Sequence, residues 1–245
     1  MLRVLNRIKR RLLKDGRIKR FLFYTVGEIL LIVIGLLIAL QINNWNSERK
    51  EEQELNEYLM KVSENVSVDI KLADSLQTQR LKIKAISKKG LDIIVADTGK
   101  NLQFLLKSIA VFSDFEFYSK KGGFESLVSS GYVSKLSRSK IDSLLFQYYA
   151  MVDDLIREER SFNGYVESME QAMSTNFPLL SAYGEFIGYE VDAVAAQKAV
   201  EELFQVTPYQ NALVRGSFQR AILRKYTEVI QTGKLLKAEI AKRVQ

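Results

Sequence analysis

The chain has 245 residues, of which 47% are hydrophobic, and a formal net charge of +7. This composition supports a sizeable core and differs from that of a disordered chain. The absence of cysteine and histidine excludes disulfides and thiolate metal sites and removes the usual general base near neutral pH. Nine basic residues among the first 42 account for the net charge, since residues 43–245 hold 27 residues of each sign. We therefore expect no nucleic-acid partner, because such a partner requires a basic face on the folded body.

Residues 1–20 form a basic tail with an amphipathic pattern. Apolar residues recur at helical spacing at Leu2, Leu5, Ile8 and Leu12. Basic residues lie mostly off that stripe, at Arg3, Arg7, Arg10, Arg11 and Lys14. A helix of this kind binds the surface of an anionic lipid bilayer, so these five residues are candidates for membrane-surface contact. A charge cluster that only sets the topology fits the tail equally well.

Residues 21–45 are predicted to form a transmembrane signal-anchor helix. The stretch 21–42 contains one formal charge and reaches about 33 Å as a helix, enough to cross a hydrocarbon core of about 30 Å. Tyr24 and Trp45 are spaced to lie in the two aromatic belts of a bilayer. A buried helix of a soluble core is the alternative, since the strictly uncharged apolar run covers only residues 29–40.

The charges on either side of this segment predict its orientation. Basic residues predominate upstream, whereas acidic residues outnumber basic ones just downstream. Because positive residues stay on the cytoplasmic side, we expect a cytoplasmic tail, an inner-membrane helix and a periplasmic region 46–245. A cleaved signal peptide would require a small-residue cleavage site, and the segment ends in QINNWN instead.

Glu28 is the charged residue of the predicted span. At 100° per residue, Gly35 and Ala39 each fall within about 20° of it around the helix. Small residues four positions apart allow a second helix to approach closely, and an intramembrane carboxylate faces a partner or a polar cavity. Glu28, Gly35 and Ala39 therefore predict a helix interface, in a homo-oligomer or with another membrane protein. Alternatively, Glu28 lies about one turn inside Tyr24 and its carboxylate reaches the inner headgroups.

The string GEILLIVIGLLIALQINNWNSERK at 27–50 follows the basic tail. Together with FESLVSSGYVSKL at 124–136, LLFQYY at 144–149 and TPYQNALV at 207–214, it resembles a family of uncharacterised single-pass membrane proteins of the Bacteroidota. The similarity covers nearly the whole chain, and the membrane motif is its most specific part. The resemblance implies a bacterial membrane protein and supplies no catalytic residue.

The region after the span is predicted to be an all-α domain. Residues 47–89 contain neither Pro nor Gly and carry a stripe of apolar residues at helical spacing. The stripe consists of Leu55, Leu59, Val62, Val66, Ile70, Ala73 and Leu76. Gly90 and Gly99 predict a break around LDIIVAD, which forms either a short strand or a helix end.

Further helices are expected at 100–113, 124–130, 191–205 and 208–243. Ser139 is the predicted N-cap of a long helix that begins near Lys140. Thr207 and Pro208 are the predicted N-cap and first-turn proline of the last helix. Since strand-like alternation is scarce, we predict a bundle of four or five helices.

No catalytic, cofactor-binding or metal-binding residue is predicted. Asp153, Asp154, Glu158 and Glu159 cluster, but the interleaved Arg157 and Arg160 are typical of a solvated helix face with local ion pairs. The KKGGF segment at 120–124 lacks the spacing of a phosphate-binding loop and indicates a glycine turn. SRSK at 137–140 is a lone S-x-x-K match without its partner motifs.

The SDFEFYS stretch at 113–119 alternates apolar and polar residues in a predicted connector. Phe115, Phe117 and Tyr118 are therefore possible contacts for a ligand or partner. We predict a non-enzymatic, membrane-anchored protein whose helical domain binds an envelope protein or its own copy. A sensory module that binds a small molecule is the alternative, disfavoured by the short cytoplasmic tail. An envelope hydrolase ranks third.

Overall fold

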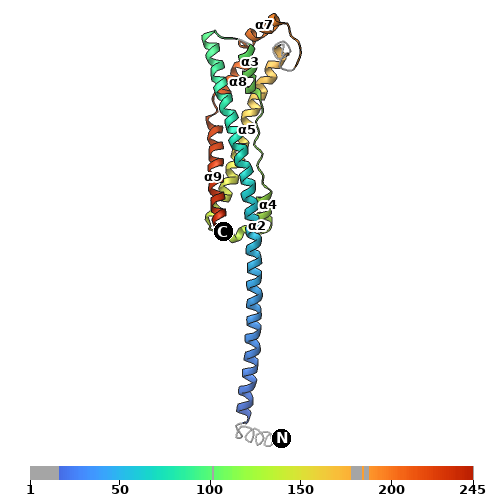
Figure 1. Cartoon of the computed structure of the whole chain (residues 1–245), viewed down its shortest axis with the longest axis vertical. Coiled ribbons are helices and arrows are strands. Elements are labelled where there is room, and N and C mark those ends of the chain that lie inside the picture. Colours follow the sequence, from blue (N-terminus) through green and yellow to red (C-terminus); the bar gives the residue numbers. More distant parts are fainter. Residues whose placement is uncertain (1–16, 101, 178–183, 185–187, 245) are drawn as a thin grey trace, which may run out of the picture. The chain divides into compact units, whose positions relative to one another are not determined.

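A computed structural model describes residues 17–100, 102–177, 184 and 188–244. Helices make up the regular structure of this part of the chain, and no strand occurs in it (Figure 1). The all-α prediction is confirmed there. The chain divides into two compact units, Met1–Leu55 and Asn56–Gln245. The residues predicted to contact the membrane surface, Arg3, Arg7, Arg10, Arg11 and Lys14, lie outside the described residues.

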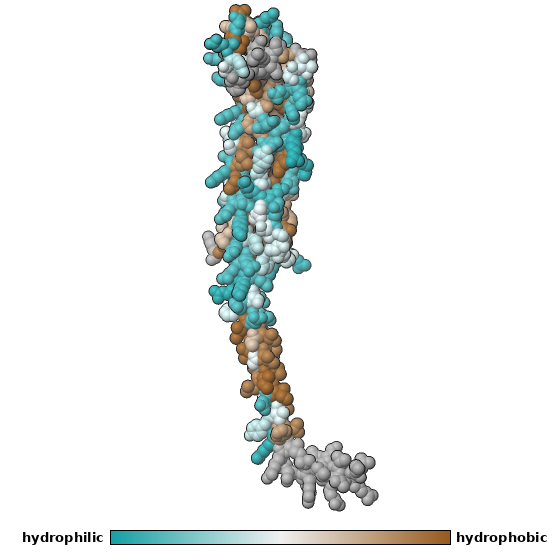
Figure 2. Space-filling model, turned by 90° about the vertical axis from the view of Figure 1, so that its right-hand side faces the viewer, coloured by the Kyte–Doolittle hydropathy of each residue, from teal (hydrophilic) through white to brown (hydrophobic). Residues whose placement is uncertain are grey.

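The described part of the first unit is the early part of helix α2 (Arg17–Ala96). Its apolar side chains point to solvent all around the helix, and Figure 2 shows them as a continuous hydrophobic band. Exposed apolar surface costs about 25 cal/mol per Å² in water, and lipid removes that cost. In the described part of the chain, α2 is the one helix long and apolar enough to cross a membrane.

The second unit begins with the rest of α2. The part of the predicted stripe that lies in this unit faces its core: five of its residues are buried, and Ile70 is half-buried. The predicted break around LDIIVAD is present, because α2 ends at Ala96, although Gly90 itself lies inside the helix. LDIIVAD is a helix end and not a strand. Beyond it, Asp97 and Gly99 adopt positive φ angles of 52° and 77°, which redirect the chain.

The remaining elements follow in chain order. They are α3 (Leu102–Ser108), η1 (Ile109–Phe112), α4 (Gly122–Ser129), η2 (Tyr132–Leu136), α5 (Lys140–Asn176), α7 (Ala193–Leu203), α8 (Thr207–Ser217) and α9 (Arg220–Val244). The predicted cap of α5 is confirmed, since the Ser139 hydroxyl accepts the N–H of Asp142 at 3.1 Å. A buried Gly90 lets α8 approach α2: a Cβ there would lie 2.9 Å from the Leu213 side chain.

The single helix predicted at 208–243 is wrong, because the chain forms α8 and α9 with a joint at Phe218 and Gln219. The N–H of Phe218 donates to the carbonyls of Val214 and Arg215, and the buried Gln219 side chain donates to the Gly216 carbonyl at 2.9 Å. These bonds satisfy carbonyls that a helix end leaves without partners. The predicted N-cap at Thr207 is also wrong: α8 begins at Thr207, and Val206 occupies the cap position.

The long helices of the second unit pack lengthwise. α5 lies against α9 and α8 (Figure 1). A Cβ at Gly233 of α9 would lie 3.0 Å from Tyr148 of α5 and 3.1 Å from Val66 and Ile70 of α2. The missing side chain therefore lets α9 approach both helices closely, and the three helices share one core.

Candidate functional site

Residues 113–121, here called the strap, connect η1 to α4 without helix or strand. Figure 1 shows the strap as an extended segment that runs along the bundle. The strap contains the SDFEFYS stretch that the sequence marks as a possible contact. Buried backbone groups outside a helix or sheet must find hydrogen-bond partners elsewhere. In the strap, those partners are side chains of α2 and α5.

Two side chains hold the carbonyl of Phe115. Arg80 of α2 donates from Nη2 at 3.0 Å, and Asn163 of α5 donates from Nδ2 at 3.1 Å. Arg80 also donates to Asn163 Oδ1 at 3.1 Å. Arg80 is only 1% exposed, so its guanidinium exchanges water for these acceptors. A buried charge without such acceptors would be strongly destabilising.

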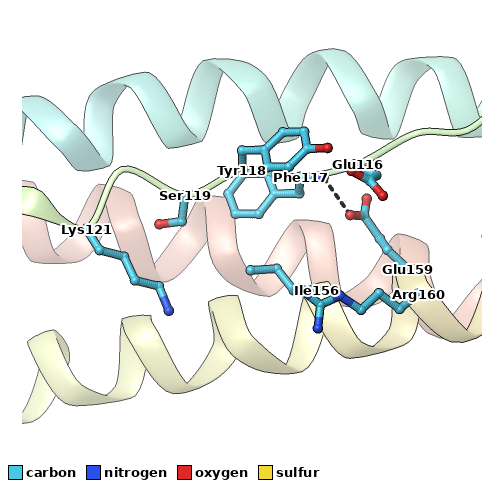
Figure 3. Close-up of a pocket in the computed structure, with 8 residues that line it drawn as sticks. All are labelled: Glu116, Phe117, Tyr118, Ser119, Lys121, Ile156, Glu159 and Arg160. Carbon is cyan, nitrogen blue, oxygen red and sulfur yellow. Dashed lines mark hydrogen bonds between the residues drawn. The ribbon is translucent and has the colours of Figure 1, made fainter.

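Glu159 of α5 binds the backbone of Phe117, two residues further along the strap. Its Oε2 accepts the backbone N–H of Phe117 at 2.6 Å (Figure 3). Its Oε1 accepts the hydroxyl of Tyr226 from α9 and lies 3.9 Å from Arg80 Nη2. Burial raises the pKa of Glu159, whereas the bonds from Tyr226 and Phe117 and the charge of Arg80 oppose that rise. Glu159 thus joins α5, α9 and the strap.

Asp69 of α2 holds the far end of the strap. It accepts the Ser119 hydroxyl at 2.5 Å, the Lys120 N–H at 2.8 Å and the Tyr148 hydroxyl at 3.0 Å. Asp69 is fully buried, and burial raises its pKa against the opposing effect of these three bonds. Burial raises the pKa of Tyr148, and the Asp69 carboxylate raises it further. Tyr148 therefore stays a neutral donor.

The three predicted contact residues have different surroundings. Phe117 is buried at 2% exposure and anchors the strap in the core. Phe115 is half-buried, with its ring centroid 5.5 Å from the Arg80 guanidinium. Tyr118 is 66% exposed. A partner that docks on the strap therefore meets Tyr118, while Phe117 holds the strap in place.

A pocket of about 220 Å³ lies between the strap and α5 (Figure 3). Its lining comprises Glu116, Phe117, Tyr118, Ser119, Lys121, Ile156, Glu159 and Arg160. Lys121 reaches across from the strap to Asp153 of α5 at 2.6 Å. The pocket therefore borders the buried network at Glu159 and opens beside the exposed Tyr118.

Comparison with models of protein families places the chain in a family. The family described as "Family of unknown function (DUF6090)" matches residues 28–167, more than half of the chain. The chain belongs to this family. No curated protein and no solved structure matches it significantly. The DUF6090 region includes the strap together with Asp69, Arg80 and Glu159, and ends before α9.

The buried network was not predicted, although the sequence contains a signal for it. Asp69 and Arg80 continue the apolar stripe of α2 at helical spacing, between Val66 and Ile83. Glu159 likewise lies at helical spacing between the buried Leu155 and Phe162 of α5. A charged residue at a core position indicates a buried polar contact, and the DUF6090 chain has three of them beside one strap.

The acidic cluster on α5 is partly corrected. The predicted solvated face holds for Asp154, which pairs with Arg157 three residues on and with Lys225 of α9 at 3.6 Å. Glu159 does not belong to that face, because it is 2% exposed and points into the bundle. Sequence spacing does not separate the buried Glu159 from its solvated neighbours, because exposed charged residues such as Arg160 lie next to it.

The glycine turn predicted for the KKGGF segment is wrong, because Gly122 and Gly123 form the first turn of α4 itself. The N–H of Gly123 donates to Asn65 Oδ1 of α2 at 2.8 Å. A Cβ at Gly123 would lie 2.8 Å from backbone atoms of Lys61 and Val62, so glycine allows the close approach of α4 to α2. Within the described residues, no group of three or more acidic side chains is placed to hold a metal ion.

The predicted membrane interface lies in the first unit. Glu28, Gly35 and Ala39 are all exposed on α2, and a Cβ added at Gly35 would meet no atom within 4 Å. The helix thus leaves space at Gly35 for a neighbour. The interface itself stays a prediction.

Proposed function

We propose that this DUF6090 member is a non-enzymatic, membrane-anchored interaction module. Its N-terminal helix spans the inner membrane, and its helical domain binds an envelope protein or a second copy in the periplasm. The restriction to Bacteroidota and the GEILLIVIGLLIALQINNWN motif as a family signature are part of this proposal. The observation that carries it is the fully exposed apolar stretch of α2, which has no covering surface in its own unit.

The buried charged groups support a structural role over catalysis. Arg80, Glu159 and Asp69 direct their hydrogen bonds to the strap and to two tyrosines. Catalytic carboxylates need access to a substrate atom within hydrogen-bond reach. Since these groups hold the protein's own backbone, we assign them to shaping the strap surface that carries Tyr118.

A sensory module is the second candidate, and the strap pocket is the observation that favours it. The pocket lies beside the buried network, and polar and apolar groups converge on it. Its volume of about 220 Å³ is smaller than that of pockets for drug-sized ligands, which span about 300–1,000 Å³. The occupant would therefore be small.

Site-directed photo-crosslinking in native membranes tests the interaction proposal. A photo-reactive aromatic amino acid is introduced at Tyr118 on the strap or at Gly35 in the span. Leu235, exposed on α9 at 54%, serves as the control position. We expect one defined adduct from Tyr118 or Gly35, identified by mass spectrometry as one envelope protein or as the chain itself. Adducts that match those from Leu235 at both positions would contradict the proposal.

A further inference from the structure

The strap pocket has charges of opposite sign at its two ends. Figure 3 shows Glu116 and Glu159 at one end and the Lys121 ammonium at the other, with Ile156 between them. Burial raises the pKa of Glu159, and the charge of Glu116 adds to that rise. Arg160 adds a second cation to the lining. Figure 3 shows the Arg160 guanidinium beside Ile156, between the two ends.

Two of these charged side chains have no hydrogen-bond or ion-pair partner among the described residues. In the described part of the chain, neither the Glu116 carboxylate nor the Arg160 guanidinium has a hydrogen bond or ion pair, and both side chains belong to exposed residues. Lys121, by contrast, is paired with Asp153 at 2.6 Å. A ligand would therefore find one free carboxylate and one free guanidinium, whose planar fork suits a carboxylate.

Glu159 provides the buried part of the site. It is 2% exposed, and its carboxylate lines the pocket while accepting from Phe117 and Tyr226. Two carboxylate oxygens offer about four acceptor positions, and these protein donors use two. The nearest cation, Arg80, stays at 3.9 Å. A ligand ammonium at this end would supply a positively charged donor, which neither Phe117 nor Tyr226 provides.

We propose that the strap pocket binds a small zwitterion of amino-acid or dipeptide size with an apolar side chain. The ligand ammonium lies at Glu116 and Glu159, and its carboxylate lies at Arg160 towards Lys121. Its side chain packs on Ile156 and beside Tyr118. The pocket volume of about 220 Å³ limits the ligand to this size. The site is separate from the membrane interface and goes beyond the proposed partner binding.

Isothermal titration calorimetry on the detergent-solubilised full chain tests this site. The probes are L-leucine and the dipeptide Ala-Leu. The comparison compounds are N-acetyl-leucine, which lacks the ammonium, and leucine amide, which lacks the carboxylate. We expect saturable binding of at least one zwitterion and affinity at least about tenfold weaker for both derivatives, as for a lost charge-assisted bond.

Paired variants locate the ligand. Glu116→Gln and Arg160→Gln should each weaken binding about tenfold or more, whereas Asp114→Asn and Arg157→Gln, charge changes nearby but outside the lining, should leave it within about twofold. Four results overturn the site: no saturable binding of either zwitterion up to about 10 mM, equal binding of a derivative, unchanged affinity in Glu116→Gln or Arg160→Gln, or equal losses in the controls. None of them bears on the crosslinking outcome, so the two proposals fail separately.

Discussion

Glu159 and Phe117 are joined by a 2.6 Å hydrogen bond from a backbone N–H to a buried carboxylate. The two residues are 42 positions apart, one on α5 and the other in a segment without regular structure. Side chains of α2 and α9 meet the same carboxylate, as Arg80 and Tyr226. The bond thus fixes where an otherwise irregular segment crosses the bundle, and with it the position of Tyr118 on the surface.

Replacing Glu159 should lower the free energy of unfolding of the second unit. Glu159→Ala leaves the Arg80 charge buried without its carboxylate and removes the acceptor of Phe117. Breaking a buried pair from one side typically costs about 3–5 kcal/mol, and we expect about 3 kcal/mol here. Urea denaturation of the full chain in detergent, followed by the near-ultraviolet circular dichroism of the buried tyrosines, measures it. Glu158→Ala, at the preceding position, should change stability by less than about 0.5 kcal/mol; equal losses would contradict the role of Glu159.

Asp69 should make stability depend on pH in a defined direction. Its pKa in the folded protein is raised above the ordinary value of 3.8, chiefly by burial. The folded state therefore binds the proton more tightly, and the stabilisation is full below the unfolded pKa and lost as pH rises through the folded pKa. Lys120 and Tyr148 also face this carboxylate, and Tyr148 stays neutral throughout.

Asp69→Asn removes that titration and isolates its effect. The free energy of unfolding of the wild type, relative to Asp69→Asn, should increase as pH falls from 7 to about 4. Urea midpoints of both proteins across this range measure the difference. A gap that stays constant, or that narrows towards low pH, would show that the Asp69 pKa is not raised.

The sequence predicted the elements that follow from periodicity and missed those set by tertiary contacts. The α2 stripe and the Ser139 cap depend on local spacing, so they were predicted correctly. Gly90 does not end α2, because glycine there serves close packing against Leu213, which a single helix does not reveal. The joint at Phe218 and Gln219 was missed for the same reason, since a buried side-chain bond to Gly216 ends α8.

The prediction that residues 113–119 form a connector is confirmed, but the side chains that hold this segment were not predicted. The alternation in SDFEFYS predicts that Phe117 contacts a ligand or partner, but its side chain packs in the core of the protein instead. Charge spacing alone groups Glu159 with its solvated neighbours on α5. The position of Glu159 between Leu155 and Phe162 indicates burial, and its acceptor role depends on a strap whose path local spacing does not predict.

The adjacent glycines of KKGGF should respond in opposite ways to the same substitution. Gly123→Ala would place a Cβ 2.8 Å from backbone atoms of α2, and overpacking of this kind costs about 1–3 kcal/mol. Gly122→Ala meets nothing within 4 Å and should be neutral or stabilise by up to about 1 kcal/mol, because alanine restricts the unfolded chain. Thermal unfolding of both variants distinguishes them. Equal midpoints would mean that α4 does not approach α2 so closely.

The charge asymmetry around the span predicts the membrane topology. Nine basic residues precede the apolar run, so the N-terminus should stay in the cytoplasm. An alkaline phosphatase fused after Gln245 should therefore be active, and a fluorescent protein fused there and exported in an unfolded state should be dark. The reverse pattern in the two fusions would place the helical domain in the cytoplasm and overturn the orientation.

The face formed by Glu28, Gly35 and Ala39 should govern association in the membrane. Gly35→Leu fills the space that a small residue leaves for a second helix and should push the helices apart. Glu28→Leu removes a polar contact worth about 1 kcal/mol between helices in a bilayer. Both changes should reduce self-association or co-purification of a partner, measured by a membrane two-hybrid assay or by crosslinking.

Ile34→Ala provides the control, because Ile34 lies on another face of the same helix and should change association little. The series also separates the two roles of Glu28. If its carboxylate only reaches the headgroups, Glu28→Leu removes a costly charge from the span, so insertion improves and association is unchanged. Association that falls in Gly35→Leu but not in Glu28→Leu would assign the interface to close packing alone. Equal signals for all three variants would show that this face makes no helix contact.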